Sequence, residues 1–279
     1  MSDFRFLKSP TSGKWVVLAP KRAKRPGEAK SSVLVCPFEG SGEPEEYRLN
    51  DVVVVKNKFP FAPVHEVVIL SSDHEKSFES LPLHHVEDIV KVYFDRYNEH
   101  KSKGQVYIFS NHGKDGGETL THPHSQIAVI PNDVELEIPV IVKTTEEIKN
   151  LTQFYLYCPN VSQWPDEVWA VPHRSEKTFG EASEEELKQL SFIIWRLIQI
   201  MDVRHGANFS YNFYIYPGKN WYFRLIPRAK LLGGFEVGTN VFVNTQVPSE
   251  TFEFIKEHFD NPDLDKIKNQ HYADYLKGA

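Results

Sequence analysis

Two histidines lie two residues apart near the middle of the chain. His122 and His124 flank Pro123 in the segment THPHSQ, directly before the apolar run 127–131. Side chains two apart on a strand point to the same face, so both imidazoles can share one site while Pro123 faces away. Either both rings bind one metal ion, or one binds a metal while the other does chemistry beside it. A bland alternative is that the rings only satisfy hydrogen bonds at a strand end.

The sequence before the histidines favours a phosphate ligand. The stretch NHGKDGGETLT holds three glycines and two threonines, and backbone N–H groups made accessible by glycine are one way in which a loop binds phosphate. A neutral imidazole is a competent nucleophile toward phosphorus, and a covalent intermediate splits one hard displacement into two easier ones. Gln126 shares the face of His124, where its amide can stabilise charge on a phosphate oxygen. The segment therefore predicts a histidine aimed at a phosphorus atom.

The elements that must position these residues occur in the same order twice. Each copy has strand material, then a helix with apolar residues at helical spacing that ends at a glycine, then two strands. The expected strand material covers 52–74 and 166–181, the helices 80–104 and 182–206, and the later strands 105–111, 122–131, 208–218 and 220–228. This order predicts an α+β duplication in which helices pack on antiparallel sheets. We expect an N-terminal half over 1–150 and a C-terminal half over 151–279.

Only the first copy carries the paired histidines. At the matching place the second copy has Asn220, Trp221 and Tyr222. Asn and Tyr are poor metal ligands and weak nucleophiles toward phosphorus. The second half is therefore expected to be a scaffold that carries no second reaction centre.

Composition narrows the class of protein. The chain has 279 residues, 41% of them hydrophobic, which is enough to bury a full core. A net charge of -6 gives no general basic surface for nucleic acid. No apolar run approaches the roughly 18 to 20 residues of a membrane span, and MSDFRFLKSP lacks the apolar core of a signal peptide. Two cysteines, Cys36 and Cys158, give no disulfide framework. We expect a cytoplasmic protein.

The segment NHGKDGGETLTHPHSQ resembles the active-site segment of galactose-1-phosphate uridylyltransferases. This family is a branch of the histidine-triad superfamily whose members carry nucleotidyl groups on the second histidine of HPHxQ. Four more segments, in the family's order, are similar to its other signatures: SPTSGKWVVLAPKRAKRP, CPFEG, VILSSDHEKSFESL and GGFEVGTN. The resemblance covers nearly the whole chain and implies a duplicated histidine-triad-like fold.

The resemblance also implies roles for individual residues. His124 would attack the α-phosphorus of a nucleoside diphosphate sugar, release sugar 1-phosphate and leave a nucleotidyl-imidazole, which an acceptor phosphate then resolves. Gln126 would hold the α-phosphate oxygens. The other implied substrate contacts are Asn111, Gly117 and Thr119 at the phosphates, Arg22 and Arg25 near the nucleotide, Asn57 at the base or ribose, and Lys230, Phe235 and Glu236 at the hexose phosphate.

A structural zinc is the point where the sequence departs from the family pattern. Relatives with this metal often use two cysteines of a C-x-x-C pair and two histidines. Here Glu39 stands where the second cysteine would be. A carboxylate is a legitimate zinc ligand, so Cys36, Glu39, His74 and His122 are the expected set. A second metal site of some relatives, a His-x-His in the C-terminal half, is expected to be absent.

The substrate is less determined than the chemistry. The resemblance favours uridylyl transfer from UDP-glucose to a hexose 1-phosphate such as galactose 1-phosphate. The alternative is an ADP-sugar or diadenosine polyphosphate phosphorylase, which transfers adenylyl groups to phosphate. A non-catalytic nucleotide-binding or metal-binding descendant of the fold is a third reading. Relatives form homodimers in which C-terminal residues of one subunit complete the partner's sugar site, so Lys230, Phe235 and Glu236 are candidates to act in trans.

Overall fold

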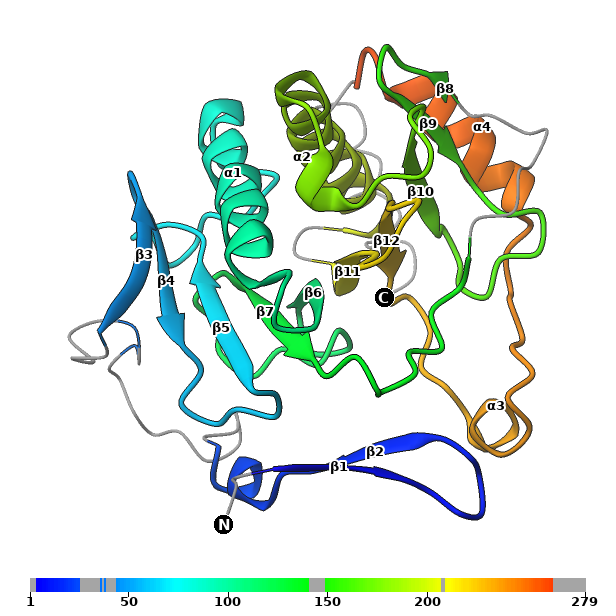
Figure 1. Ribbon diagram of the computed structural model, residues 1–279. Helices are drawn as coiled ribbons and strands as arrows, with labels where there is room; N and C mark the ends of the chain where they lie inside the picture. The colour runs from blue at the N-terminus through cyan, green and yellow to red at the C-terminus, as the bar shows by residue number, and fades with distance from the viewer. Residues whose placement is uncertain are drawn as a thin grey trace.

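The computed structural model describes residues 4–25, 44–140, 149–206 and 209–262, together with Cys36 and Phe38. Within these residues the chain forms an N-terminal hairpin, a large sheet and four α-helices (Figure 1). The α-helices are α1 (Leu83–His100), α2 (Glu184–His205), α3 (Gly234–Thr239) and α4 (Pro248–His258). Two short 3-10 helices cover Pro20–Lys24 and Phe179–Glu181. None of the helices in the described ranges combines the length and apolar character needed to cross a membrane.

Ten strands form one antiparallel sheet in the order β3-β4-β5-β7-β6-β11-β12-β10-β9-β8. The first five are β3 (Glu45–Leu49), β4 (Val52–Lys56), β5 (Val64–Ile69), β6 (Gln105–His112) and β7 (His124–Ile130). The other five are β8 (Lys149–Asn150), β9 (Phe154–Tyr157), β10 (Val168–Pro172), β11 (Tyr211–Ile215) and β12 (Phe223–Pro227). The sheet is continuous across the two halves of the chain because β6 pairs with β11.

The two halves repeat one arrangement. In the first, β5 leads into α1 and then into β6 and β7, which lie in the order β5-β7-β6. In the second, β10 leads into α2 and then into β11 and β12, which lie in the order β11-β12-β10. The two units therefore meet at their equivalent strands, β6 and β11. The duplicated α+β architecture predicted from the repeated element order is confirmed.

The helices α1 and α2 lie side by side on one face of the sheet (Figure 1). Their apolar faces and the inward side chains of both halves form one continuous core, which includes Ile89 of α1 and Ile194 of α2. Ser183 is the N-cap of α2, because its hydroxyl accepts from the backbone N–H of Glu186 at 3.2 Å.

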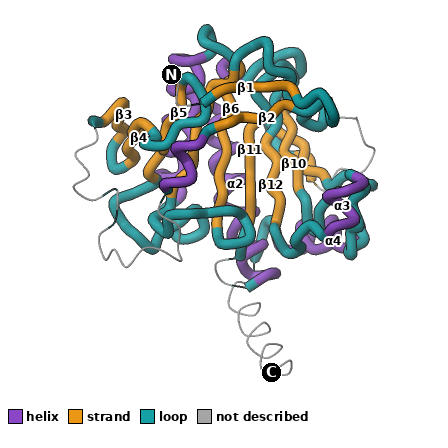
Figure 2. Tube along the Cα trace, turned by 90° about the horizontal axis from the view of Figure 1, so that it is seen from below, coloured by secondary structure: helices purple, strands orange, loops and turns teal. Residues whose placement is uncertain are grey.

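The opposite face of the sheet carries the N-terminal hairpin of β1 (Arg5–Lys8) and β2 (Trp15–Leu18). Figure 2 shows this hairpin crossing the strands. Its Phe6 and Trp15 pack against a small cluster that contains Ala128 and Ile130 of β7. The hairpin therefore packs against the strand that begins with His124.

Candidate active site

His124 begins β7 and lies on the sheet face away from α1 and α2. Its neighbour Ser125 points to the helices, where its Oγ lies 2.6 Å from the hydroxyl of Tyr93 in α1. The Nδ1 of His124 lies 2.9 Å from the carbonyl oxygen of His122. Because a carbonyl only accepts, Nδ1 carries the proton and the neutral ring has its lone pair on Nε2. Burial lowers the pKa of His124, which favours this neutral form.

Gln126 lies on the same face as His124, and two side chains approach its amide oxygen. The Nε2 of His65 in β5 is 3.0 Å from Gln126 Oε1, and the Nδ2 of Asn57 is 3.4 Å from it. Asn57 is held in turn, because its Oδ1 accepts from the backbone N–H of Phe59 at 2.9 Å. The structure therefore brings the predicted residues Asn57 and Gln126 into one hydrogen-bonded group.

Two arginines supply positive charge beside this group. Arg22 donates through Nη1 to the carbonyl oxygen of Phe59 at 2.7 Å and stacks its guanidinium over the Phe61 ring. Arg25 donates through Nη2 to Thr119 Oγ1. Burial, together with the nearby charge of Arg25, lowers the pKa of Arg22 to about 10, so Arg22 is still charged at neutral pH. Among the described residues no carboxylate forms an ion pair with either arginine.

The glycine-rich loop joins β6 to the histidines. Gly117 has φ of +80°, a conformation that favours glycine, and a Cβ on Gly116 would lie 2.2 Å from the carbonyl oxygen of His112. The backbone N–H groups of Gly116, Gly117 and Glu118 donate to carbonyl oxygens inside the loop at 3.0–3.1 Å. The sequence suggested that these N–H groups bind a phosphate, but in the folded chain they are occupied by bonds within the loop. What the loop does is bring Thr119 to Arg25.

Asn111 lies at the end of β6, on the side of the sheet where the two halves join. Its Oδ1 accepts from Asn212 Nδ2 of β11 at 2.8 Å. The same Asn212 amide also donates to the carbonyl oxygen of Gly116 at 2.7 Å. The second half thus holds both Asn111 and the glycine-rich loop in place.

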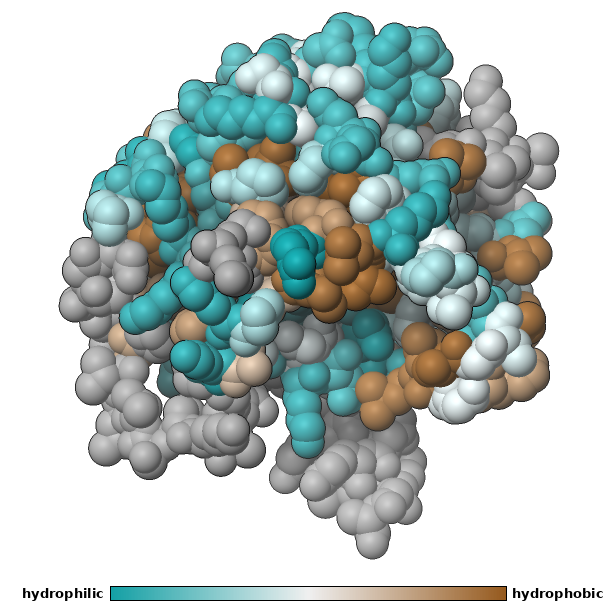
Figure 3. All heavy atoms as spheres, turned by 60° about the horizontal axis from the view of Figure 1, so that its bottom comes forward, coloured by the Kyte–Doolittle hydropathy of each residue, from teal (hydrophilic) through white to brown (hydrophobic). Residues whose placement is uncertain are grey.

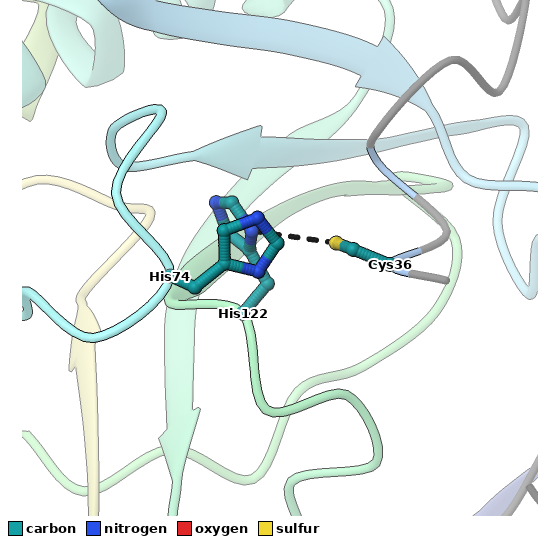
Figure 4. Close-up of side chains that lie close together, drawn as sticks. All are labelled: Cys36, His74 and His122. Carbon is teal, nitrogen blue, oxygen red and sulfur yellow. Dashed lines mark hydrogen bonds between the residues drawn. The ribbon is translucent and has the colours of Figure 1, made fainter. Parts of the chain in front are cut away.

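Cys36, His74 and His122 come together from three separate segments (Figure 4). Their candidate ligand atoms all lie within 4.8 Å of one another. The Nδ1 of His122 is 3.4 Å from the Cys36 sulfur, and its Nε2 is 2.8 Å from the carbonyl oxygen of Ser71. The carbonyl requires a proton on Nε2, which leaves Nδ1 as the lone-pair atom that faces the thiol. These three residues can hold a metal ion, and the predicted fourth ligand, Glu39, lies outside the described residues.

The predicted sugar-side residues lie elsewhere. Lys230 donates to Glu236 Oε1 at 2.8 Å and to the carbonyl oxygen of Val243 at 2.5 Å. Phe235, in α3, is 55% exposed. In Figure 1, α3 lies beyond the second half of the sheet, apart from β7. Within one chain the structure does not bring Lys230, Phe235 and Glu236 to His124.

Two residues of the site escaped the sequence reasoning. Phe38 places its ring 5.5 Å from the ring of His122 and 5.8 Å from that of His124. His65 is 4% exposed and contacts Gln126. Phe38 stood inside the quoted CPFEG segment, but its type alone indicates no more than packing. The signal for His65 was a lone histidine in an otherwise apolar and acidic strand, VHEVVI, which is more often a core residue than a functional one.

Comparison with known proteins agrees with this geometry. A family model for the N-terminal domain of galactose-1-phosphate uridyl transferase matches residues 43–129, a range that contains His122, His124 and Gln126. A galactose-1-phosphate uridylyltransferase from Thermotoga maritima is 25% identical, over 92% of this chain and 98% of the relative. Residues 43–129 therefore carry the N-terminal domain of the galactose-1-phosphate uridylyltransferase family.

Members and neighbours of the galactose-1-phosphate uridylyltransferase family differ in the activity for which they are named. An ADP-glucose phosphorylase from Arabidopsis thaliana is 23% identical over 90% of this chain and 92% of its own length. The solved structure of an Arabidopsis thaliana ADP-glucose phosphorylase with bound ADP-glucose superimposes with a TM-score of 0.70 at 21% identity, covering 91% of this chain and 99% of that one. The fold is thus shared across both named activities, and the fold alone does not select one of them.

Proposed function

We propose that the protein transfers a nucleotidyl group through a covalent intermediate on His124. The observation that carries this proposal is the hydrogen bond from His124 Nδ1 to the carbonyl oxygen of His122, at 2.9 Å. It leaves the lone pair of Nε2 free, and burial lowers the pKa of the ring so that the lone pair is present at neutral pH. A neutral, oriented imidazole is what nucleophilic attack on phosphorus requires.

The reaction has two balanced steps. In the first, His124 Nε2 forms a bond to the α-phosphorus of a nucleoside diphosphate sugar, while the bond from that phosphorus to the bridging oxygen breaks and sugar 1-phosphate leaves. In the second, an oxygen of the acceptor phosphate bonds to the same phosphorus and the P–N bond breaks. The histidine returns to its starting form, so the cycle needs no redox cofactor.

The residues around His124 have complementary roles in this proposal. Gln126 donates from its amide nitrogen to an α-phosphate oxygen, where negative charge grows in the transition state. Arg22 and Arg25 neutralise the diphosphate, and Asn111, Gly117 and Thr119 line it. Asn57 contacts the base or ribose. Two hydrogen bonds in the folded chain support these roles: Arg25 donates to Thr119, and Asn57 donates to Gln126.

A single structural zinc completes the proposed site. A thiol and two imidazoles are ligands that zinc prefers, and the proton on His122 Nε2 directs Nδ1 of that ring to the Cys36 sulfur. We propose Glu39 as the fourth ligand. When bound, the ion would tie the Cys36 and His74 segments to the residue two before the nucleophile. His122 would thereby be fixed, and with it the carbonyl that orients His124.

We propose UDP-glucose as the nucleotidyl donor and a hexose 1-phosphate such as galactose 1-phosphate as the acceptor. An ADP-sugar or diadenosine polyphosphate phosphorylase is the second candidate, because an ADP-glucose phosphorylase matches the chain over nearly the same length. The test is turnover of UDP-glucose and ADP-glucose, each with galactose 1-phosphate or inorganic phosphate. Product from UDP-glucose and galactose 1-phosphate supports the first candidate, and product from ADP-glucose and phosphate alone supports the second. Tight nucleotide binding without any turnover would favour a binding protein instead.

We also propose a homodimer in which the sugar-side residues act on the partner's site. Lys230, Phe235 and Glu236 lie apart from His124 within one chain. Exposed apolar side chains surround them, and Figure 3 shows apolar surface on the side of the molecule that carries the hairpin and α3. A monomer in light scattering that still turns over substrate would contradict this arrangement.

The proposal has three further parts. The protein is cytoplasmic, and it acts on small molecules and binds neither nucleic acid nor membrane. The chain divides into an N-terminal half over 1–150 and a C-terminal half over 151–279.

A further inference from the structure

His65 contacts the proposed active site but is not among the substrate contacts or metal ligands assigned above. It lies on β5 with 4% of its surface exposed, and its ring meets the Phe61 ring edge-on with centroids 4.2 Å apart. Its Nε2 lies 3.0 Å from Gln126 Oε1. The side chain thus directly contacts the residue that is proposed to hold the α-phosphate.

The contacts of the His65 ring determine where its proton sits. The backbone N–H of Phe61 points to Nδ1 at 3.2 Å. A backbone N–H can only donate, so Nδ1 must be the acceptor and the proton of the neutral ring must be on Nε2. Burial is the largest of the effects that lower the pKa of His65 to about 4, so the ring is neutral at pH 7. His65 Nε2 therefore donates to Gln126 Oε1.

This donor fixes the orientation of the Gln126 carboxamide. Asn57 Nδ2 approaches the same oxygen at 3.4 Å, and the Asn57 amide cannot turn around because its Oδ1 accepts from the Phe59 N–H. With two donors at its oxygen, the Gln126 amide must direct its NH₂ group away from His65 and Asn57. A flipped amide would set NH₂ against both donors, which is unfavourable in a buried site.

We propose that His65 is a positioning residue that locks the Gln126 carboxamide with its NH₂ group presented to the reacting phosphate. This inference rests on the proposed function and deepens it. His65 touches no reacting atom; its effect on the rate passes through Gln126. Without the Nε2 donor, the amide of Gln126 would sample both orientations, and one of them places an oxygen against the negatively charged phosphate.

The alternative is that His65 only anchors the 57–61 segment by accepting from the Phe61 N–H. Two substitutions separate these roles. His65→Asn places an amide oxygen near the position of Nδ1, so it keeps the acceptor for Phe61 and loses the donor to Gln126. His65→Gln places an amide nitrogen near the position of Nε2, so it keeps the donor to Gln126.

The experiment measures the rate of adduct formation on His124 in a single turnover with UDP-glucose and with ADP-glucose. Each variant is made in the wild-type chain and in a Gln126→Ala chain, and melting temperatures identify any variant that is poorly folded. We expect His65→Asn to slow adduct formation by about 10- to 100-fold, mainly at saturating donor, because the lost interaction acts in the transition state. We expect His65→Gln to restore the rate to within about threefold of the wild type.

The Gln126→Ala background provides the decisive comparison. If His65 acts through Gln126, His65→Asn should change the rate less than about twofold there. An equal loss in both backgrounds, or equal rates for His65→Asn and His65→Gln, would overturn the positioning role while the proposed function stands. A wild-type chain that forms no adduct with either donor, and turns neither over, would overturn the proposed function and this inference with it.

Discussion

A buried ion network behind the active-site strands should contribute strongly to stability. Glu66 follows His65 on β5 and points to α1, where Arg96 Nε donates to its Oε2 at 3.0 Å. His100 Nε2 lies 2.9 Å from Glu66 Oε1. Lys103 donates to His100 Nδ1 at 3.0 Å, and Arg96 Nη2 lies 2.8 Å from His100 Nε2, so the four side chains form one connected cluster. Glu66 is 2% and Arg96 8% exposed.

Arg96→Met would leave the buried Glu66 carboxylate with only His100 of this network as a partner. Removing one partner of a buried pair typically costs about 3 to 5 kcal/mol. For a chain of this length that corresponds to a fall in melting temperature of about 5 to 9 °C. The assay is thermal unfolding followed by circular dichroism, with urea unfolding as a second measure of the free energy of unfolding.

The dependence on pH provides a second check of the same network. Burial alone raises the pKa of Glu66, but hydrogen bonds from His100 and Arg96 outweigh it, so the pKa is lowered in the folded chain. Stability from a carboxylate with a lowered pKa is present above its unfolded value and is lost as the pH falls through the folded value. The gap between wild type and Arg96→Met should therefore be full at pH 7 and shrink below about pH 4.

Lys188→Met is the matched control. Lys188 pairs with Glu184 on α2 at 2.7 Å, but the two side chains are 60% and 76% exposed. An exposed pair of this kind contributes less than about 1 kcal/mol. If Arg96→Met and Lys188→Met lowered the melting temperature equally, the reasoning about the buried network would be refuted.

Three further predictions concern the site itself. Purified protein should contain close to one zinc per chain by elemental analysis, and Cys36→Ser should lower that content; two metals per chain, or none in a folded and active protein, would contradict the proposed ligand set. Because the pKa of His65 is lowered to about 4 while an unfolded histidine titrates near about 6.5, the folded chain should lose stability as the pH falls between these values, by about 3 kcal/mol from this group. The loss should be smaller in His65→Gln, and an identical acid profile would exclude the buried neutral imidazole as its cause. Tyr93→Phe should destabilise the chain by about 1 to 3 kcal/mol in urea unfolding, because it leaves the buried Ser125 hydroxyl without its 2.6 Å partner. An unchanged midpoint would show that Ser125 finds another hydrogen-bond partner.

The sequence predicted those parts of the fold that depend on local patterns. Helical spacing of apolar residues, with a glycine at the end of each pattern, located α1 and α2. The pairing of β6 with β11 was not predicted. It joins strands about 100 residues apart in the chain, and nothing in either strand alone specifies its partner.

The residues of the candidate site were likewise predictable only where a local sequence pattern specifies their position. The two-residue spacing of His122 and His124 was informative because strand geometry translates it directly into a shared face. The role of the glycine-rich loop was only half predicted, since its backbone N–H groups bond inside the loop, a fact that depends on its exact fold. His65 could not be found, because its contact with Gln126 arises from the pairing of β5 with β7.

The most direct test of the central claim is the intact mass of the protein after mixing with UDP-glucose and, separately, with ADP-glucose. We expect a gain equal to one uridylyl group with UDP-glucose. The gain should be lost on acid treatment, absent in His124→Ala and retained in the control variant His258→Ala, whose histidine lies on α4. A gain equal to one adenylyl group would keep His124 as the nucleophile and change the donor. An adduct that persists in His124→Ala, or turnover of either donor by that variant at the wild-type rate, would contradict nucleotidyl transfer through His124.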